Sequence, residues 1–297
     1  MDHGMMDDTT KGQLNAYLML VKAVVRQYKG KLDELRKLTN EDCDEFGLSA
    51  SFMEWTRPFF QFLYHQYFRV DTVGIKSIPA KSPAILVGNH SGTLPYDGTM
   101  SHMAIFNEHP KQRLLRFLVD DFVNNIPLVG GAIEKMGGIR ASFDNATELL
   151  RKGHLVMIFP EGTDGIGKTY DEKYQLRPFD HAGFVRLAIK MRVPVIPVSI
   201  IGAEEIHPLI WKSKTMAEKL GVPYIPFTPT FPWLGPLGFI PLPTKWKIVF
   251  GKPIRYTKFK TSDARRNKLV SQEADKVRAI IQNTLDRELK KRKSIWE

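Results

Sequence analysis

The fold of this chain is decided where an apolar run meets a proline and a carboxylate: Val156-Met157-Ile158-Phe159-Pro160-Glu161-Gly162-Thr163. The apolar residues are typical of a buried strand, and the strand ends at Pro160 because proline has no N–H for the sheet. Glu161 is then held at the strand tip, and Gly162 lets the backbone turn closely under a ligand. Strands that carry polar groups at their carboxyl ends are typical of α/β sheets.

Similar apolar runs recur from residue 69 onward and alternate with helical patterns. This alternation predicts strands joined by helical crossovers. We expect strands at Val70–Val73, Ala84–Gly88, Leu115–Val119, His154–Phe159, Val195–Ile201 and Lys247–Phe250. We expect helices at Thr99–Phe106, Asn145–Lys152, Ala182–Met191 and Asp263–Lys290. The predicted fold is α/β, with a mixed, mostly parallel central sheet flanked by helices.

Residues 1–69 carry a helical pattern instead and form a preface to the sheet. Apolar side chains between Leu14 and Leu35 recur at steps of three and four, which predicts one amphipathic helix or two that meet at Gly30. A second, aromatic-rich helix is expected to start near Thr56, with Pro58 in its first turn. These helices either cap the core or dock at the headgroup level of a membrane. We therefore separate residues 1–69 from an α/β domain, residues 70–297, that includes the C-terminal helix.

The composition of the 297-residue chain excludes several classes of protein. Its 43% hydrophobic and 25% charged residues are typical of a globular protein. A single cysteine, Cys43, rules out a disulfide framework and a cysteine-based metal cluster. The net charge is +11, and residues 252–297 hold 14 lysines and arginines against 6 acids. This basic region either attracts polyanions or is a solvated helix face.

One uncharged stretch, between Lys219 and Lys245, is long enough to cross a bilayer. It contains seven prolines, each of which removes a backbone donor, so we predict no transmembrane helix there. The N-terminus lacks the basic start and apolar centre of a secretory signal. The aromatic part of the uncharged stretch, residues 227–239, either covers the core as an ordered loop or exposes an apolar patch.

Two further motifs precede the Glu161 turn. In the first, His90 follows the strand predicted at Ala84–Gly88, and six residues separate it from Asp97. In the second, Arg140 follows a glycine pair that ends at Gly138. An arginine supplies a fixed, always charged fork that suits phosphate oxygens.

In this order, the three motifs resemble the glycerolipid acyltransferase family, the PlsC-like or lysophosphatidate acyltransferases, over about residues 70–255. The resemblance implies that His90 removes the proton of an acceptor hydroxyl and that Asp97 orients the imidazole ring. The family usually has four residues between histidine and aspartate. Here Pro95 stands at the usual acid position, and the longer spacing resembles one branch of the family with a lengthened first motif.

The same resemblance assigns the binding residues. Arg140, beside Gly138, would contact the phosphate or another polar head of the acceptor. Glu161 would bind the hydroxyl or glycerol part of the acceptor, while Gly162 and Thr163 shape the pocket. A surface salt bridge of Arg140 with an acid such as Glu134 remains open as an alternative.

The implied function is transfer of a fatty acyl group from acyl-CoA or acyl carrier protein to the hydroxyl of a lysophospholipid such as 1-acylglycerol 3-phosphate. The alternative acceptor is a neutral lipid or glycolipid alcohol, such as diacylglycerol or a fatty alcohol. The alternative of another class is a non-catalytic protein that binds anionic membranes. We expect a peripheral enzyme at the cytoplasmic face of a membrane, with no metal, no cofactor beyond the acyl co-substrate and no nucleic-acid partner.

Motifs for other chemistries are weaker. The sequence contains no Gly-x-Ser-x-Gly elbow of a serine hydrolase. The stretch from Gly162 to Thr169 formally matches a phosphate-binding loop. The acidic Glu161 directly before it and the lack of a strand-end aspartate downstream argue against nucleotide binding.

Overall fold

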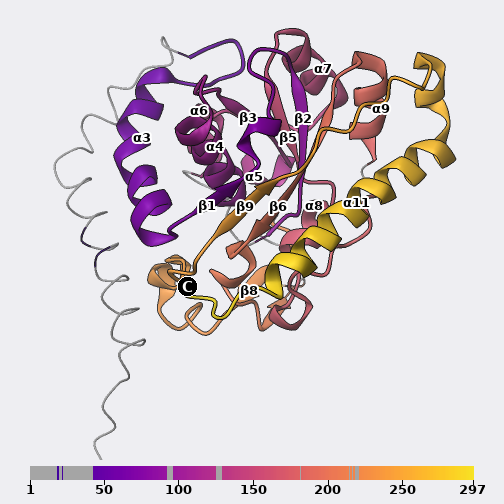
Figure 1. The fold of residues 1–297 in the computed structure, drawn as a ribbon. Helices are drawn as coiled ribbons and strands as arrows, with labels where there is room; N and C mark the ends of the chain where they lie inside the picture. The colour runs from indigo at the N-terminus through magenta and orange to yellow at the C-terminus, as the bar shows by residue number, and fades with distance from the viewer. Residues whose placement is uncertain are drawn as a thin grey trace, which may run out of the picture.

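A seven-stranded sheet forms the centre of the protein (Figure 1). The computed structural model describes residues 43–91, 96–124, 129–180, 182–213 and 221–297, together with Met19, Lys22, Thr215 and Ala217. All neighbouring strands run parallel except β6 and β9, which confirms the predicted mixed, mostly parallel sheet. In spatial order the strands are β1 (Asp71–Val73), β9 (Lys247–Phe250), β6 (Val195–Ile201), β2 (Ala84–Gly88), β5 (Leu155–Ile158), β3 (Leu115–Val119) and β4 (Gly138–Arg140).

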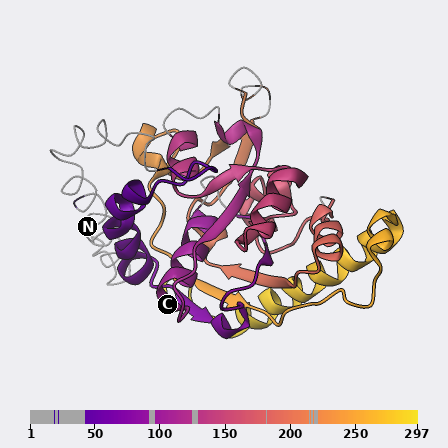
Figure 2. The ribbon, with the colours of Figure 1, turned by 90° about the horizontal axis from the view of Figure 1, so that it is seen from above.

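Helices cover both faces of the sheet (Figures 1 and 2). Along β2, Leu86 faces one helical layer and Ile85 faces the other, so the strand is buried over its whole length. This is expected of a parallel strand that is covered on both faces. The first layer comprises α3 (Ala50–Phe62), the π-helical turn η2 (Leu63–Tyr67), α4 (Tyr96–Glu108), α5 (Asp121–Asn124) and α6 (Val129–Lys135). The second comprises α7 (Phe143–Arg151), α9 (Gly183–Met191) and α11 (Asn267–Leu289).

Short elements connect these layers and form the ends of the sheet. They are η3 (Ile75–Ser77), α8 (Gly162–Ile166), η4 (Tyr170–Glu172), η5 (Ala203–Glu205), η6 (Gly235–Phe239), η7 (Thr261–Arg265) and a two-stranded hairpin, β7 (Trp211–Ser213) with β8 (Ile225–Phe227). No helix in the described ranges is both long and apolar enough to span a bilayer.

Most of the predicted elements are confirmed. Four strands, β2, β3, β6 and β9, have the predicted bounds, and β1 and β5 are shorter at their ends. The predicted C-terminal helix is interrupted, because Arg266 is extended between η7 and α11. Apart from Met19 and Lys22, the helix expected within residues 14–35 lies outside the described residues, and the domain boundary at residue 69 stays a prediction.

The predicted start of the aromatic-rich helix near Thr56 is wrong. Helix α3 begins at Ala50, because the hydroxyl of Ser49 accepts a hydrogen bond from the N–H of Phe52 and caps the first turn. Pro58 therefore lies inside the helix rather than in its first turn. In the sequence, Ser49 is the residue that signals this helix start, whereas Pro58 signals a later one.

Three short strands were not predicted. Strand β4 follows Gly137, whose φ of 98° makes the turn directly before the strand. Strands β7 and β8 each have three residues, and a proline in β8 concealed the strand pattern. Residues 227–239 were expected either to cover the core or to expose an apolar patch. Each interpretation holds for part of the stretch, since Thr228 is buried while Trp233 is 77% exposed.

Candidate active site

The sheet brings two of the sequence motifs together. Strands β2 and β5 are parallel neighbours in which Val87 pairs with Ile158, so the segments after both strands leave the same edge of the sheet. His90 follows β2 and Glu161 follows β5. The backbone N–H of His90 donates to Oε1 of Glu161 at 2.9 Å, so the two motifs form one local structure.

His90 and Asp97 form a hydrogen-bonded pair. Nδ1 of His90 lies 2.6 Å from Oδ2 of Asp97, and the side chain of His90 is 21% exposed whereas that of Asp97 is fully buried. A carboxylate only accepts hydrogen bonds, so Nδ1 carries the donated proton and the neutral ring has its lone pair on Nε2. This is the tautomer that a general base needs.

Asp97 is held by backbone groups as well as by the histidine. It lies in the first turn of α4, which begins earlier than the helix predicted at Thr99. Oδ2 accepts the N–H of Ser91 at 3.1 Å, and Oδ1 accepts the N–H of Gly98 at 2.7 Å. A carboxylate near a helix N-terminus is favoured by the helix dipole. The longer spacing therefore still delivers the acid to His90.

Small residues make room for the imidazole of His90. The ring stacks on Phe159 with centroids 4.4 Å apart. A Cβ on Gly165, within α8, would lie 2.9 Å from Cβ of His90 and 2.6 Å from Cβ of Glu161. Helix α8 can approach both residues this closely only because Gly165 has no side chain.

Glu161 lies beneath the pair in a sealed ion cluster, Glu161–Lys168–Glu204. Besides the N–H of His90, its carboxylate accepts the N–H of Arg177 at 2.8 Å and Nζ of Lys168 at 3.2 Å. Lys168 also donates to Oε1 of Glu204 at 3.0 Å, and none of the three side chains is more than 4% exposed. Protein donors thus surround the carboxylate of Glu161, which was expected to contact the acceptor.

Lys168 was not assigned to the site from the sequence. Its only signal was the formal match to a phosphate-binding loop, in which a lysine reaches a phosphate. Here the lysine is buried between two glutamates instead. Burial raises the pKa of Glu204, whereas the charge of Lys168 lowers it, so the lysine favours the ionised carboxylate.

A cleft opens in front of the His90–Asp97 pair. Its volume is about 560 Å³, within the range of roughly 300–1,000 Å³ that is usual for small-molecule sites. His90, Asp97 and Gly162 line it, and the remaining wall is mainly apolar. The apolar wall includes Phe117, Val119, Phe122, Phe143, Ile158, Phe159 and Leu187.

Comparison with known proteins shows the family of the chain. A family model described as Acyltransferase matches residues 69–201. An uncharacterized protein of Mycobacterium leprae (strain TN) is 43% identical over 254 residues, which cover 85% of this chain and 69% of that protein. The chain belongs to the PlsC-like glycerolipid acyltransferase family.

One further relative and one solved structure are also similar to this acyltransferase. A Bos taurus protein named "DGAT1/2-independent enzyme synthesizing storage lipids" is 27% identical over 222 residues, covering 74% of this chain and 60% of that protein. The crystal structure of the 1-acyl-sn-glycerophosphate acyltransferase PlsC from Thermotoga maritima has a TM-score of 0.55. That match covers 96% of this chain and 99% of the other at 19% identity, and it shows the shared fold.

The other predicted site residues of the acyltransferase lie around the cleft or away from it. Thr163 is exposed next to Gly162. Gly138 is buried in β4, where a Cβ would lie 2.9 Å from the carbonyl oxygen of Ile133, so close packing explains the glycine. Arg140 is exposed and makes a two-bond ion pair with Asp121, at 2.6 and 2.9 Å. The acid considered from the sequence, Glu134, is not the partner in this pair.

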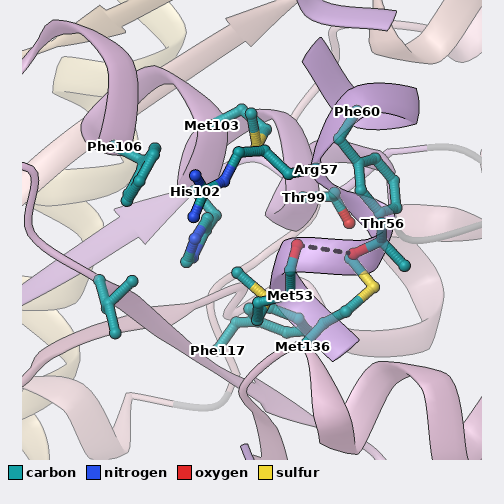
Figure 3. A pocket seen from close by; sticks show the side chains of 11 residues that line it. Met53, Thr56, Arg57, Phe60, Thr99, His102, Met103, Phe106, Phe117 and Met136 are labelled. Carbon is teal, nitrogen blue, oxygen red and sulfur yellow. Dashed lines mark hydrogen bonds between the residues drawn. The ribbon is translucent and has the colours of Figure 1, made fainter. Parts of the chain in front are cut away.

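A second pocket of the acyltransferase lies between α3 and α4 (Figure 3). It is lined mainly by methionine and phenylalanine side chains, and Phe117 separates it from the active-site cleft by lining both. His102 points into it, and burial lowers the pKa of this histidine. At about 60 Å³ the pocket is well below the roughly 300 Å³ at which ligand sites begin. Of these two cavities, the cleft of about 560 Å³ in front of His90 is the one with room for a lipid chain.

Proposed function

We propose that this acyltransferase moves a fatty acyl group from a thioester, acyl-CoA or acyl carrier protein, to the hydroxyl of a lipid acceptor, with His90 as the general base. The observation that carries the proposal is the His90–Asp97 pair at the wall of a 560 Å³, mainly apolar cleft. An acyl thioester is already activated, but an alcohol is a poor nucleophile until its proton leaves. A histidine held in the right tautomer supplies that step.

The proposed steps need no covalent acyl-enzyme. Nε2 of His90 takes the hydroxyl proton while the alcohol oxygen attacks the thioester carbonyl. The buried carboxylate of Asp97 stabilises the imidazolium that forms. The tetrahedral intermediate then collapses, the carbon–sulfur bond breaks, and the leaving thiolate receives the proton from His90. The proposed reaction requires no metal and no further cofactor.

Glu161 acts in this scheme by positioning His90. Its carboxylate binds the N–H of His90 and two other donors of the protein. The N–H of Gly162 donates to the carbonyl oxygen of Phe159 at 3.1 Å, so this donor is already used within the protein. We therefore assign Glu161 to support of the catalytic loop, with Gly162 and Thr163 at the mouth of the acceptor site.

The leading acceptor is a lysophospholipid such as 1-acylglycerol 3-phosphate, with Arg140 as the contact to its phosphate. Ala141 and Ser142, directly after Arg140, line the cleft, so a headgroup at the cleft mouth is within reach of this arginine. Binding would require the phosphate to replace Asp121 as the partner of the guanidinium. Both side chains are about two-thirds exposed, so this exchange costs little.

A neutral acceptor is the second candidate, and a specific observation favours it. Arg140 is already paired with Asp121. Arg186, the one arginine among the described residues that line the cleft, donates to the carbonyl of Ala264 and to Asn267. A neutral glycerolipid or fatty alcohol would leave both sets of bonds intact. The name of the Bos taurus relative, which refers to storage lipids, points the same way.

The test is acyl transfer by the purified full chain. Labelled acyl-CoA and acyl carrier protein are each offered with a panel of lysophospholipids, diacylglycerol and fatty alcohols. His90→Ala is expected to lower ester formation by about 10²–10⁴-fold, the usual contribution of a positioned base. Its control is His65→Ala, which changes an exposed histidine of η2.

Near-normal turnover by a folded His90→Ala protein would refute the base assignment. If no acceptor consumes either thioester, the non-catalytic membrane-binding alternative gains support. The location at the cytoplasmic face of a membrane is part of the same proposal.

A further inference from the structure

Exposed large apolar side chains are concentrated in one stretch of the chain. Ten are exposed in the described ranges, and five of these lie within residues 210–237. These five, which we call the apolar lip, are between 52% and 77% exposed: Ile210, Trp211, Trp233, Leu234 and Leu237. Such a concentration marks an interaction surface rather than scattered exposure.

The two segments of the apolar lip belong to one structure. Trp211 pairs with Phe227 across the β7–β8 hairpin, and their rings lie 4.6 Å apart. The N–H of Ile210 donates to the carbonyl of Phe227 at 2.8 Å. Directly after Phe227, the hydroxyl of Thr228 accepts the N–H of Phe231 at 2.9 Å. The hairpin and the turn that carries Trp233 are therefore continuous.

The turn is held in shape by its own inner residues. Phe231 and Phe239 pack against each other with ring centroids 4.3 Å apart. The hydroxyl of Thr230 donates to the carbonyl of Gly238 at 3.0 Å, and a Cβ on Gly238 would lie 2.8 Å from Cα of Phe231. With these groups turned inward, Trp233, Leu234 and Leu237 remain outside on an ordered support. An ordered apolar surface loses little conformational entropy when it binds.

The same structure is attached to the C-terminal end of α8. Nζ of Lys212 donates to the carbonyl of Gly167 at 2.6 Å, and the hydroxyl of Tyr224 donates to the carbonyl of Ile166 at 2.7 Å. These carbonyls end α8, the helix that starts at Gly162 in the cleft. Figure 1 shows α8 and β8 at the end of the sheet toward which β6 runs. A surface that binds the apolar lip is thereby brought to the active site.

The charge of this segment and the type of its side chains indicate that the partner of the apolar lip is a lipid bilayer. Residues 208–245 contain four lysines and a single acid, Glu218. Anionic headgroups attract such a segment, and tryptophan prefers the headgroup level of a membrane. We propose that the apolar lip inserts into the headgroup region of an anionic bilayer and so presents the cleft to lipid acceptors. This proposal rests on the proposed function for its purpose, but binding itself requires no catalysis.

The experiment measures binding of the full chain to sedimented vesicles, without acyl donor. Phosphatidylcholine vesicles are compared with vesicles that also contain phosphatidylglycerol. The variant Trp233→Ser/Leu234→Ser/Leu237→Ser is expected to bind the anionic vesicles about tenfold more weakly or worse, since three apolar side chains no longer leave water. The control, Val73→Ser/Ile280→Ser, removes exposed apolar side chains outside the lip and should bind like the parent.

A second measurement does not depend on the triple variant. Lipids brominated on the acyl chain should quench the tryptophan fluorescence of the parent, and Trp211→Phe/Trp233→Phe should lose most of this quenching. Unchanged quenching, or binding of the folded triple variant within twofold of the parent, overturns the proposal. A shift from dimer to monomer in the triple variant, with vesicle binding retained, would assign the lip to contacts between copies and also overturn it. Vesicle binding without ester formation would contradict only the proposed function.

Discussion

Two ionisable clusters lie side by side at the same edge of the sheet, and they differ in their access to solvent. The His90–Asp97 pair has one open member, with the histidine 21% exposed at the cleft. In the Glu161–Lys168–Glu204 cluster, every side chain is at most 4% exposed. The open pair can exchange a proton with a substrate. The sealed cluster cannot, and its charges instead hold the loop that carries His90.

A residue of a sequence motif and a catalytic group need not be the same. Glu161 belongs to the motif at the tip of β5, yet in the described part of the chain its hydrogen bond to the His90–Asp97 pair comes from the backbone N–H of His90. Lys168, which the sequence linked to nucleotide binding, completes the support. Breaking the sealed cluster should therefore reduce stability and activity together.

Removal of Lys168 is expected to have the largest effect on the difference between the two clusters. Lys168→Met leaves two buried carboxylates without their cation, which should lower the free energy of unfolding by about 3–5 kcal/mol. Denaturant unfolding of parent and variant measures this loss. Lys276→Met is the control, because that lysine is 62% exposed beside Glu273 and should cost less than about 1 kcal/mol. A loss as small as that of the control would show that the cluster is not a support.

The stability loss of Lys168→Met should also depend on pH. Burial already raises the pKa of Glu204, and the variant removes the lysine that lowers it. A carboxyl group whose folded pKa lies above its unfolded value contributes full stability below the unfolded pKa and loses it as pH rises through the folded pKa. The deficit of the variant should therefore shrink from neutral toward mildly acidic pH. Unfolding curves across that range test the sign.

Gly165→Ala should disturb both clusters at once, and its effect on stability should be smaller than that of Lys168→Met. The added methyl group would press on the Cβ atoms of both Glu161 and His90, so we expect a loss of about 1–3 kcal/mol in unfolding free energy and a lower kcat. Gly131→Ala, which meets nothing within 4 Å in α6, is the control. Unchanged kcat in a destabilised Gly165→Ala protein would separate the support of Glu161 from the position of His90.

The smallest effect is expected at Arg140, which lies outside both clusters. Its exposed ion pair with Asp121 contributes little to folding, so Arg140→Ala should leave the unfolding free energy close to that of the parent. If Arg140 binds a phosphate, the variant should raise KM more for a phosphate-bearing acceptor than for a neutral one. Equal changes in KM would remove the phosphate role and favour the neutral acceptor.

The predictability of the fold followed the strength of local patterns. β-Branched, continuous apolar runs at Ala84–Gly88 and Val195–Ile201 identified central strands to the residue, because full burial leaves little other use for such runs. Strand β4 and the β7–β8 hairpin are three-residue elements whose pairing depends on distant partners, so no local periodicity could reveal them. The start of α3 could have been predicted from Ser49, which caps the helix. Pro58 pointed to a later start, because proline is common in the first turn of a helix.

The site residues also differed in whether they could be predicted from the sequence. His90 and Asp97 were identified by residue type and order, and the structure brings them together although the spacing is longer. The partners of Glu161 could not be predicted, since Lys168 and Glu204 are contributed by separate segments after β5 and β6. Likewise, the sequence left the proline-rich stretch undecided between cover and exposed patch, and both uses occur within it.

By itself the sequence determined the family, the α/β sheet and the histidine with its acid, because these depend on local patterns and on motifs short enough to read along the chain. Only the tertiary structure decided which charges are sealed and which face the cleft, and where the apolar side chains of residues 210–237 point. The physical reason is burial: the same glutamate, lysine or tryptophan has a different role in contact with water than beneath a packed layer, and packing is a property of the assembled chain.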